Sequence, residues 1–161
     1  FPDLCEANDD PRAKLLFADG IQWVKDAAPG SIDIIIVDST DPIGPAEGLF
    51  SAAFYRDCYK ALGDDGIVVH QSESPLIHQQ LIRDMRGAMS NAGFSRQLTI
   101  NFPQPVYPSG WWSATLAGKK GPLTEFRIQA SQNKTFPTRY YNHDIHLAAM
   151  AMPEFWKQQP A

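Results

Sequence analysis

Two aspartates that follow an apolar run are the residues of this sequence best suited to acid–base chemistry. Asp38 comes directly after residues 34–37, which are all β-branched, and Asp41 follows in a loop held by Pro42. A carboxylate at the rim of a buried strand suits a general base, because it can accept a proton from a bound nucleophile. A second carboxylate facing the same cavity would attract a cationic ligand where water is partly excluded. A plainer interpretation remains open, in which both aspartates only form turn hydrogen bonds.

Polar residues also follow two other apolar runs of strand length. Asp19 and Gly20 come after residues 13–17, and the segment 70–74, His-Gln-Ser-Glu-Ser, ends the run that begins at residue 67. In an open parallel sheet, ligands bind outside the carboxyl ends of the strands, so we expect the three polar groups to line a single crevice. Asp19 taken alone could equally be the N-cap of a helix.

Alternating strand and helix patterns would carry these residues to one edge of a sheet. Strands are predicted over residues 13–17, 32–37, 67–70, 94–100 and 111–117, and helices over 21–27, 51–61, 74–92 and 144–152. The second strand is typical of a central parallel strand covered on both faces. The last two strands follow each other without a helix, which predicts an antiparallel hairpin at the edge of the sheet. The fold class is therefore α/β, with a doubly wound sheet.

The composition excludes several classes of protein. The chain has 161 residues, of which 43% are hydrophobic and 20% charged, and this suits one folded domain rather than a disordered chain. The 14 basic and 18 acidic residues give a net charge of −4, with no basic block longer than residues 119–120, so binding to nucleic acid is not expected. No apolar run approaches the roughly 18 residues that span a membrane.

The cysteines and histidines do not form an evident metal site. Cys5 and Cys58 are the only cysteines, and their spacing predicts a reduced pair in a cytoplasmic protein rather than a disulfide framework. Of the four histidines, His143 and His146 lie close together in the sequence. We expect these two to be helix-capping and packing groups, and we expect no metal.

Several segments, in this order along the chain, resemble the spermidine synthases, a family of polyamine aminopropyltransferases. Residues 38–50, DSTDPIGPAEGLF, resemble the signature loop of that family. Further similar segments are 9–12 (DDPR), 18–20 (ADG), 71–74 (QSES), 107–110 (YPSG) and 140–146 (YYNHDIH). The resemblance covers residues 9 to 153, and it implies a Rossmann-like sheet of the class I methyltransferase type.

The resemblance also implies a reaction. The family transfers the aminopropyl group of decarboxylated S-adenosylmethionine to putrescine, which gives spermidine and methylthioadenosine without a metal or a bound cofactor. Asp38 would then be the base that takes a proton from the attacking amine, and Asp41 would hold the charges of the diamine. An alkylammonium titrates near pH 10, so it must lose a proton before its lone pair can attack.

Other site residues are implied only by this resemblance. Gln71 and Tyr107 would line the diamine site, where the ring of Tyr107 suits ammonium and methylene groups. Asp19 would accept a hydrogen bond from the adenine amino group, Gly20 would allow close approach, and Pro45 would pack near the adenine. The parent protein would be a homodimer or homotetramer that binds these small molecules and neither nucleic acid nor a membrane.

The resemblance further implies that residues 1–161 form a single, partial catalytic domain. The Gly-rich nucleotide loop of the family and its amino-terminal β domain precede the matching region, and the chain opens with Phe1 while its first Met is Met85. Ala18 also stands where many members have Gly. We therefore expect this chain alone to be nearly inactive. Two other interpretations remain open: an S-adenosylmethionine-dependent small-molecule methyltransferase, and a non-enzymatic truncated remnant.

Overall fold

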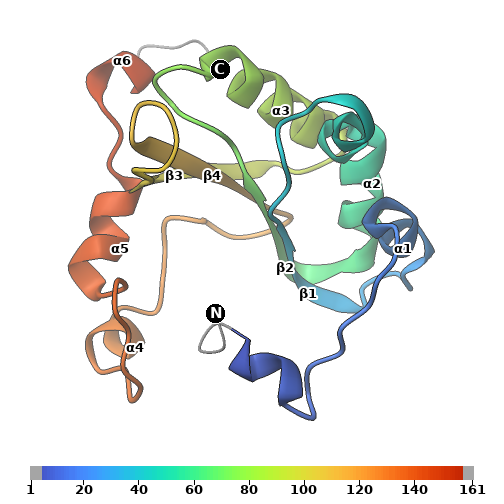
Figure 1. Cartoon of the computed structure of the whole chain (residues 1–161), viewed down its shortest axis with the longest axis horizontal. Helices are drawn as coiled ribbons and strands as arrows, with labels where there is room; N and C mark the ends of the chain where they lie inside the picture. Colours follow the sequence, from blue (N-terminus) through green and yellow to red (C-terminus); the bar gives the residue numbers. More distant parts are fainter. Residues whose placement is uncertain (1–4, 158–161) are drawn as a thin grey trace.

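The computed structural model describes residues 5–157, and its centre is a four-stranded mixed sheet (Figure 1). The strands are β1 (Ile32–Val37), β2 (Leu62–Gln71), β3 (Arg96–Pro103) and β4 (Trp111–Gly118). The α-helices are α1 (Gly20–Asp26), α2 (Ala52–Ala61), α3 (Gln79–Asn91), α4 (Ile128–Gln132), α5 (His143–Met150) and α6 (Glu154–Lys157). Two 3₁₀ helices, η2 (Glu6–Asp9) and η3 (Gly44–Phe50), precede α1 and α2.

The strand order is β1-β2-β4-β3, and each of the four strands contributes one of its two ends to the edge of the sheet that carries the site. β1 and β2 are parallel, and Val37 lies opposite His70. β4 is antiparallel to β2 and to β3, so the beginning of β4 and the end of β3 lie at the edge where β1 and β2 end. The predicted antiparallel edge hairpin is therefore confirmed, with β3 as its outer strand.

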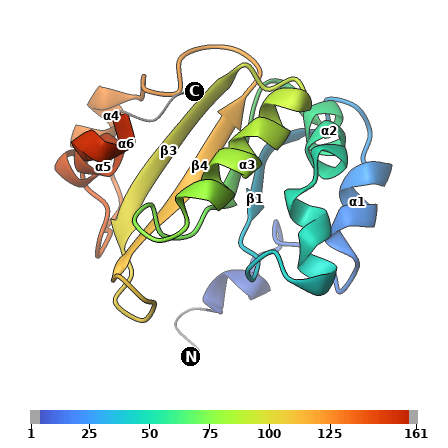
Figure 2. The ribbon, with the colours of Figure 1, turned by 90° about the horizontal axis from the view of Figure 1, so that it is seen from above.

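Helices α1, α2 and α3 lie on one side of the sheet, and α4 and α5 lie on the other, beside β3 (Figure 2). The core lies between the sheet and the first three helices, where the fully buried side chains of Tyr55, Cys58, Val68 and Met89 pack together. The predicted cap of α2 is confirmed, because the Ser51 hydroxyl accepts from the Phe54 amide at 3.1 Å. Among the described residues, no helix is long and apolar enough to cross a membrane.

The strand predicted over residues 13–17 is wrong. These residues form no regular secondary structure, and the side chains of Leu15, Leu16 and Phe17 are exposed by 63%, 48% and 95%. A strand needs a neighbour to satisfy its backbone groups, and within residues 5–157 no other strand pairs with this segment. Its apolar composition was therefore not sufficient to make it a strand.

The description of residues 32–37 as a central, doubly covered strand is also wrong for the described part of the chain. β1 is at the edge of the sheet, and its side chains alternate: Ile35 and Val37 are buried against the helices, whereas Ile34 and Ile36 are exposed by 61% and 73%. Helices α1 and α2 cover only one face here, while α5 covers the other face at β3.

Helix α3 begins five residues later than the predicted start at Ser74. Residues 74–78 instead form a turn, in which the His78 amide donates to the Ser74 carbonyl at 2.8 Å. The hydroxyl of Ser74 is held by the hydroxyl of Ser109 at 2.8 Å, in the β3–β4 connection. The same hydroxyl accepts from the Leu76 amide at 3.3 Å, so Ser74 closes this turn instead of capping α3.

The helix expected over 144–152 is present as α5, and its neighbours show what the two histidines do. The N-cap is Asn142, whose side chain accepts from the Ile145 amide at 2.8 Å, so the capping role expected of the histidines is wrong. The packing role is confirmed, because His146 stacks on Phe126 with ring centroids 3.8 Å apart.

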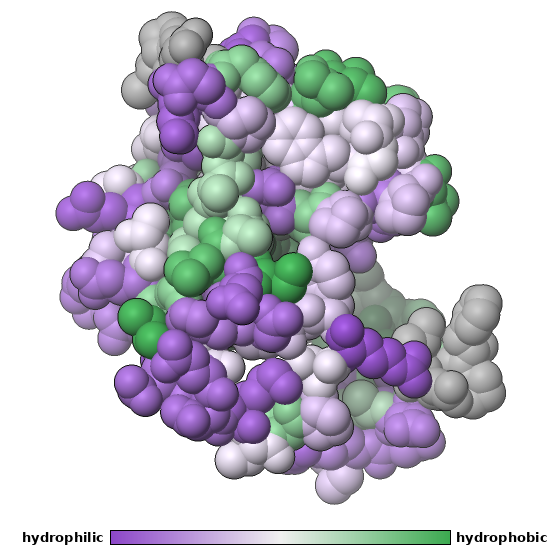
Figure 3. Space-filling view, turned by 90° about the vertical axis from the view of Figure 1, so that its left-hand side faces the viewer, coloured by the Kyte–Doolittle hydropathy of each residue, from purple (hydrophilic) through white to green (hydrophobic). Residues whose placement is uncertain are grey.

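The side of α4, α5 and α6 shows a hydrophobic stripe between hydrophilic side chains (Figure 3).

The exposed face of β1 predicts self-association of the 161-residue chain. Replacing Ile36 with Lys puts a charge on this apolar face. The change should weaken association at least about fivefold, because about 1 kcal/mol of the free energy of association, which comes from burying the apolar side chain, is lost. Light scattering over a concentration series measures the effect. Ile77→Lys is the control, since Ile77 is 53% exposed but lies outside the sheet. Equal association of the wild type and Ile36→Lys would contradict the prediction.

Candidate active site

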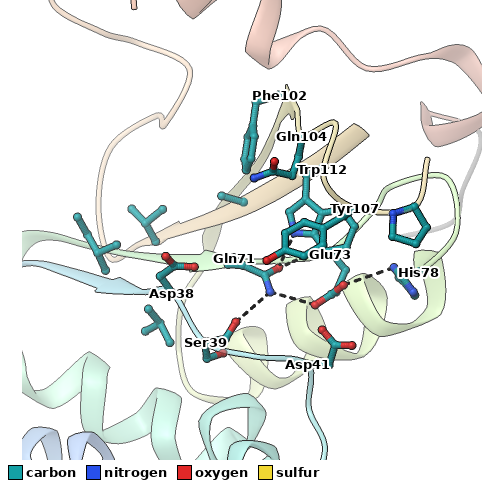
Figure 4. A pocket seen from close by; sticks show the side chains of 15 residues that line it. Asp38, Ser39, Asp41, Gln71, Glu73, His78, Phe102, Gln104, Tyr107 and Trp112 are labelled. Carbon is teal, nitrogen blue, oxygen red and sulfur yellow. Dashed lines mark hydrogen bonds and ion pairs between the residues drawn. The ribbon is translucent and has the colours of Figure 1, made fainter. Parts of the chain in front are cut away.

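A cavity of about 530 Å³ opens at the edge where β1 and β2 end (Figure 4). It is bounded by β1 and the following loop, the end of β2, the turn before α3, and the β3–β4 hairpin. The lining residues are Ile36, Val37, Asp38, Ser39, Asp41, Val69, Gln71, Glu73, His78, Phe102, Gln104, Tyr107, Pro108, Trp112 and Ala114. Four of the residues singled out from the sequence, namely Asp38, Asp41, Gln71 and Tyr107, thus line the same cavity.

The two aspartates have different surroundings. Asp38 continues directly from β1 and is exposed rather than placed at a buried rim, because β1 is an edge strand with one open face. None of the residues that line the pocket hydrogen-bonds its carboxylate (Figure 4). Asp41 lies two residues beyond Ser39 and interacts with the side chain of Glu73. Asp38 therefore has both oxygens available to a ligand in this cavity, whereas Asp41 interacts with another carboxylate.

Gln71 fixes the geometry of the site. Its side-chain nitrogen donates to the Ser39 carbonyl at 3.2 Å and to the Glu73 carboxylate at 3.0 Å. Its side-chain oxygen accepts from the Glu73 amide at 2.6 Å and from the Trp112 indole at 3.2 Å. Both donors and both lone pairs of the amide are thus used. Gln71 lines the cavity as predicted, but here it ties the loop after β1 to β2 and β4.

Glu73 is a site residue that our sequence analysis did not single out. Only 1% of its surface is exposed, and its backbone φ of 63° lies in the left-handed region that non-glycine residues rarely adopt. Burial raises its pKa above the ordinary value; the hydrogen bond from Gln71 opposes this, and the nearby Asp41 carboxylate adds to it. His78 Nδ1 lies 3.6 Å from the Glu73 carboxylate. The QSES run contained this residue, but a positive φ and burial cannot be read from one sequence.

Aromatic rings form the wall of the cavity on the side of the hairpin. Tyr107 and Trp112 have ring centroids 4.8 Å apart at an angle of 33°, and His78 meets the edge of Trp112 at 6.0 Å. Hydrogen bonds within the connection hold Tyr107 in place, with the Tyr107 amide donating to the Gln104 carbonyl at 3.2 Å. Such a wall suits ammonium and methylene groups. Trp112 was not predicted as a site residue, because the sequence pattern of its strand does not show whether an aromatic side chain packs in the core or lines a cavity.

The residues expected near an adenine do not line this cavity. Asp19 caps α1, where its carboxylate accepts from the amides of Ile21 at 2.9 Å and Gln22 at 3.3 Å. Gly20 is the first residue of that helix, and Pro45 lies in the first turn of η3. The structure therefore supports the capping interpretation of Asp19, and the adenine-binding role of these three residues stays a prediction.

A second, largely apolar cavity of about 600 Å³ lies between β3, β4 and α5, and it contains none of the predicted site residues. Within residues 5–157, no group of three or more His, Cys, Asp or Glu side chains could hold a metal ion. Cys5 and Cys58 are free thiols.

The chain matches a known family over most of its length. The family model described as the spermine/spermidine synthase domain matches residues 1–128. The chain belongs to this family. The resemblance predicted from the segments of the sequence is thereby confirmed, and with it the assignment of the family to transferases.

Curated relatives within the spermine/spermidine synthase family are named polyamine aminopropyltransferases. The protein of Methylococcus capsulatus is 64% identical over 156 residues, which are 97% of this chain and 54% of the relative. The protein of Thioalkalivibrio sulfidiphilus is 59% identical over 160 residues, which are 99% of this chain and 56% of the relative. The chain thus spans about half the length of the curated relatives that it matches.

Solved spermidine synthases share the fold. A spermidine synthase in complex with the transition-state analogue AdoDATO has a TM-score of 0.88 and 32% identity over 97% of this chain and 53% of that chain. The spermidine synthase of Thermotoga maritima has a TM-score of 0.85 and 32% identity over 97% of this chain and 52% of that chain. The predicted Rossmann-like α/β fold class is confirmed.

The raised pKa of Glu73 predicts a pH-dependent loss of stability. A group whose folded pKa exceeds its unfolded value stabilises the fold below the unfolded pKa and loses that contribution as pH rises through the folded pKa. Glu73→Gln should therefore unfold at a higher temperature than the wild type at pH 7, by about 2–4 °C for each kcal/mol. Calorimetry of the chain measures this difference.

Below the unfolded pKa of Glu73 the difference between wild type and Glu73→Gln should disappear, because both side chains are then neutral. The exposed Glu125→Gln change is the control, and it should leave the pH dependence of unfolding unaltered. A constant difference between Glu73→Gln and wild type at all pH values would contradict the role of the buried carboxylate.

Proposed function

We propose that the protein of which this chain forms part transfers an aminopropyl group from decarboxylated S-adenosylmethionine to putrescine. The observation that carries this proposal is the single cavity that combines Asp38, Asp41 and Glu73 with the ring wall of Tyr107 and Trp112. Among the described residues that line the cavity, none is Lys or Arg. Such an anionic, partly aromatic cavity favours a flexible molecule that carries two ammonium groups.

The proposed reaction needs one general base to accept a proton and no general acid to donate one. Asp38 accepts a proton from one ammonium of the diamine, and the nitrogen lone pair that this frees attacks the methylene carbon next to the sulfonium. The new C–N bond forms as the C–S bond breaks, and the sulfur leaves with the electron pair as a neutral thioether. Because the leaving group needs no proton, the remaining task is to place the two cationic substrates in line. No metal or bound cofactor takes part in this scheme.

Different residues hold the two substrates in this proposal. Asp41 and Glu73 bind the distal ammonium, and Tyr107 contacts the methylene chain. Gln71 holds the carboxylates in their positions relative to one another. Asp19, Gly20 and Pro45 contribute to the adenine site, as the resemblance implies. The solved spermidine synthase that binds a transition-state analogue supports this assignment, since the chain shares its fold.

Two further properties belong to the same proposal. Free thiols at Cys5 and Cys58 suit a reducing compartment, so we place the protein in the cytoplasm. The homodimer or homotetramer implied by the resemblance stays a prediction.

The donor distinguishes this proposal from a methyltransferase of similar fold. The complete protein should consume decarboxylated S-adenosylmethionine and leave S-adenosylmethionine untouched when each is offered separately with putrescine. Mass spectrometry of the products detects spermidine and methylthioadenosine in the first case. Methylated amine from S-adenosylmethionine would overturn the proposal.

Replacing each aspartate should separate the two proposed roles. In the complete protein, Asp38→Asn should lower kcat by about 10²–10⁴-fold with the donor Kd retained, because the proton acceptor is lost. Asp41→Asn should mainly raise the KM for putrescine, because it removes a charge that binds the distal ammonium. Steady-state kinetics and donor-binding calorimetry measure these effects.

The matched control is Asp33→Asn, since Asp33 lies on the same strand, is exposed and does not line the cavity. Its kcat and KM should equal those of the wild type. Wild-type turnover by Asp38→Asn would remove Asp38 from the role of base, and an unchanged putrescine KM in Asp41→Asn would do the same for the binding role of Asp41.

A further inference from the structure

A buried histidine directly behind the active-site loop has no part in the chemistry described above. His70, near the end of β2, has no exposed surface. Its Nδ1 lies 2.6 Å from the hydroxyl of Tyr55 on α2, and its Nε2 lies 3.5 Å from the hydroxyl of Ser39. The ring of Phe50 packs on the imidazole with centroids 4.4 Å apart. The imidazole therefore connects a core helix to the loop that carries the two aspartates.

The hydrogen-bond partners define the direction of this connection. In the described part of the chain, the imidazole is the one hydrogen-bond partner of the fully buried Tyr55 hydroxyl, so Tyr55 donates its proton to Nδ1. Nε2 then carries the ring proton and donates to the Ser39 hydroxyl. The Ser39 hydroxyl in turn donates to the Thr40 carbonyl at 3.1 Å. Every donor in this chain of bonds, from Tyr55 to Thr40, has one acceptor.

Ser39 is consequently held by two neighbouring residues of β2. His70 binds its hydroxyl, and the adjacent Gln71 binds its carbonyl at 3.2 Å. Ser39 follows Asp38 directly and lies two residues before Asp41. A shift of Ser39 would therefore move the Asp38 carboxylate relative to any substrate in the cavity.

We infer that Tyr55 and His70 are positioning residues, which orient Asp38 through the hydroxyl of Ser39. This inference rests on the proposed function of Asp38 as the base. Burial lowers the pKa of His70 to about 4, so the ring stays neutral near pH 7 and keeps one donor and one acceptor nitrogen. The Tyr55 and Ser39 hydroxyls thus act on Asp38 through the same bond path, and of the two only Ser39 lines the cavity.

A double-mutant cycle in the complete protein tests the shared path. Tyr55→Phe and Ser39→Ala should each lower kcat by about tenfold, the effect expected for loss of one positioning hydrogen bond, and leave the donor KM unchanged. Because both changes break one path, the double variant should lose no more than either single variant. Additive losses in kcat, or wild-type kcat in Ser39→Ala, would overturn the inference.

Tyr59→Phe is the matched control for the loss of a tyrosine hydroxyl. Tyr59 lies one turn further along α2, and its ring contacts Phe94 and Lys119 rather than His70. This variant should keep wild-type kcat. A tenfold loss in Tyr59→Phe as well would mean that kcat responds to general damage of α2, and it would overturn the positioning role.

The tautomer of His70 gives a readout that does not depend on activity. ¹⁵N NMR of the histidine-labelled 161-residue chain should show a protonated Nε2 and an unprotonated Nδ1 in the wild type, and a change of the Nε2 signal in Ser39→Ala. A protonated Nδ1 would overturn the inferred path. If the complete wild-type protein transferred no aminopropyl group, the proposed function would fail, while this spectrum would still decide the hydrogen-bond path.

Discussion

The parallel pairing of β1 with β2 is the constraint on which the site depends. Val37 lies opposite His70, so Asp38, the first residue after β1, comes next to Gln71, the last residue of β2. A slip of one residue in this register would turn Asp38 away from the cavity, since successive strand residues point to opposite faces. The register is held by the aliphatic residues of β1 that are buried against α1 and α2. The packing of β1 against the helices therefore determines where the carboxylates lie.

Electrostatic repulsion is the cost of assembling this site. Three carboxylates line one cavity, and one of them, Glu73, is almost fully buried at a strained backbone position. Gln71 lowers this cost by donating to Glu73, while the burial of Glu73 favours its neutral form. A cationic ligand would remove the remaining repulsion. The carboxylates that repel one another are thus those that would bind an ammonium, which is the expected arrangement for a preorganised cavity.

Local signals in the sequence predicted the elements whose stability is local. The Ser51 cap and the apolar pattern before Asp38 identified α2 and β1. The same pattern singled out Asp38 and Asp41, the resemblance added Gln71 and Tyr107, and all four line the cavity. Tertiary context decided the rest. The segment 13–17 has strand composition but no partner strand within residues 5–157, and Ser74 lies in a turn that contacts Ser109, so that α3 begins at Gln79. Glu73 was missed because a buried carboxylate at positive φ has no signature in a single sequence.

The two halves of the proposed site depend on the chain in different ways. The described residues that line the acceptor cavity all lie between residues 36 and 114, and the bonds of Gln71 join the loop after β1 to β2 and β4. This cavity is therefore assembled by contacts between the strands and the loops that follow them. Asp19 and Pro45, by contrast, lie at the N-terminal ends of α1 and η3, and neither lines the cavity that contains the carboxylates. Because transfer requires the donor carbon in line with the amine, the acceptor geometry can be complete while the reaction still depends on how the donor is held.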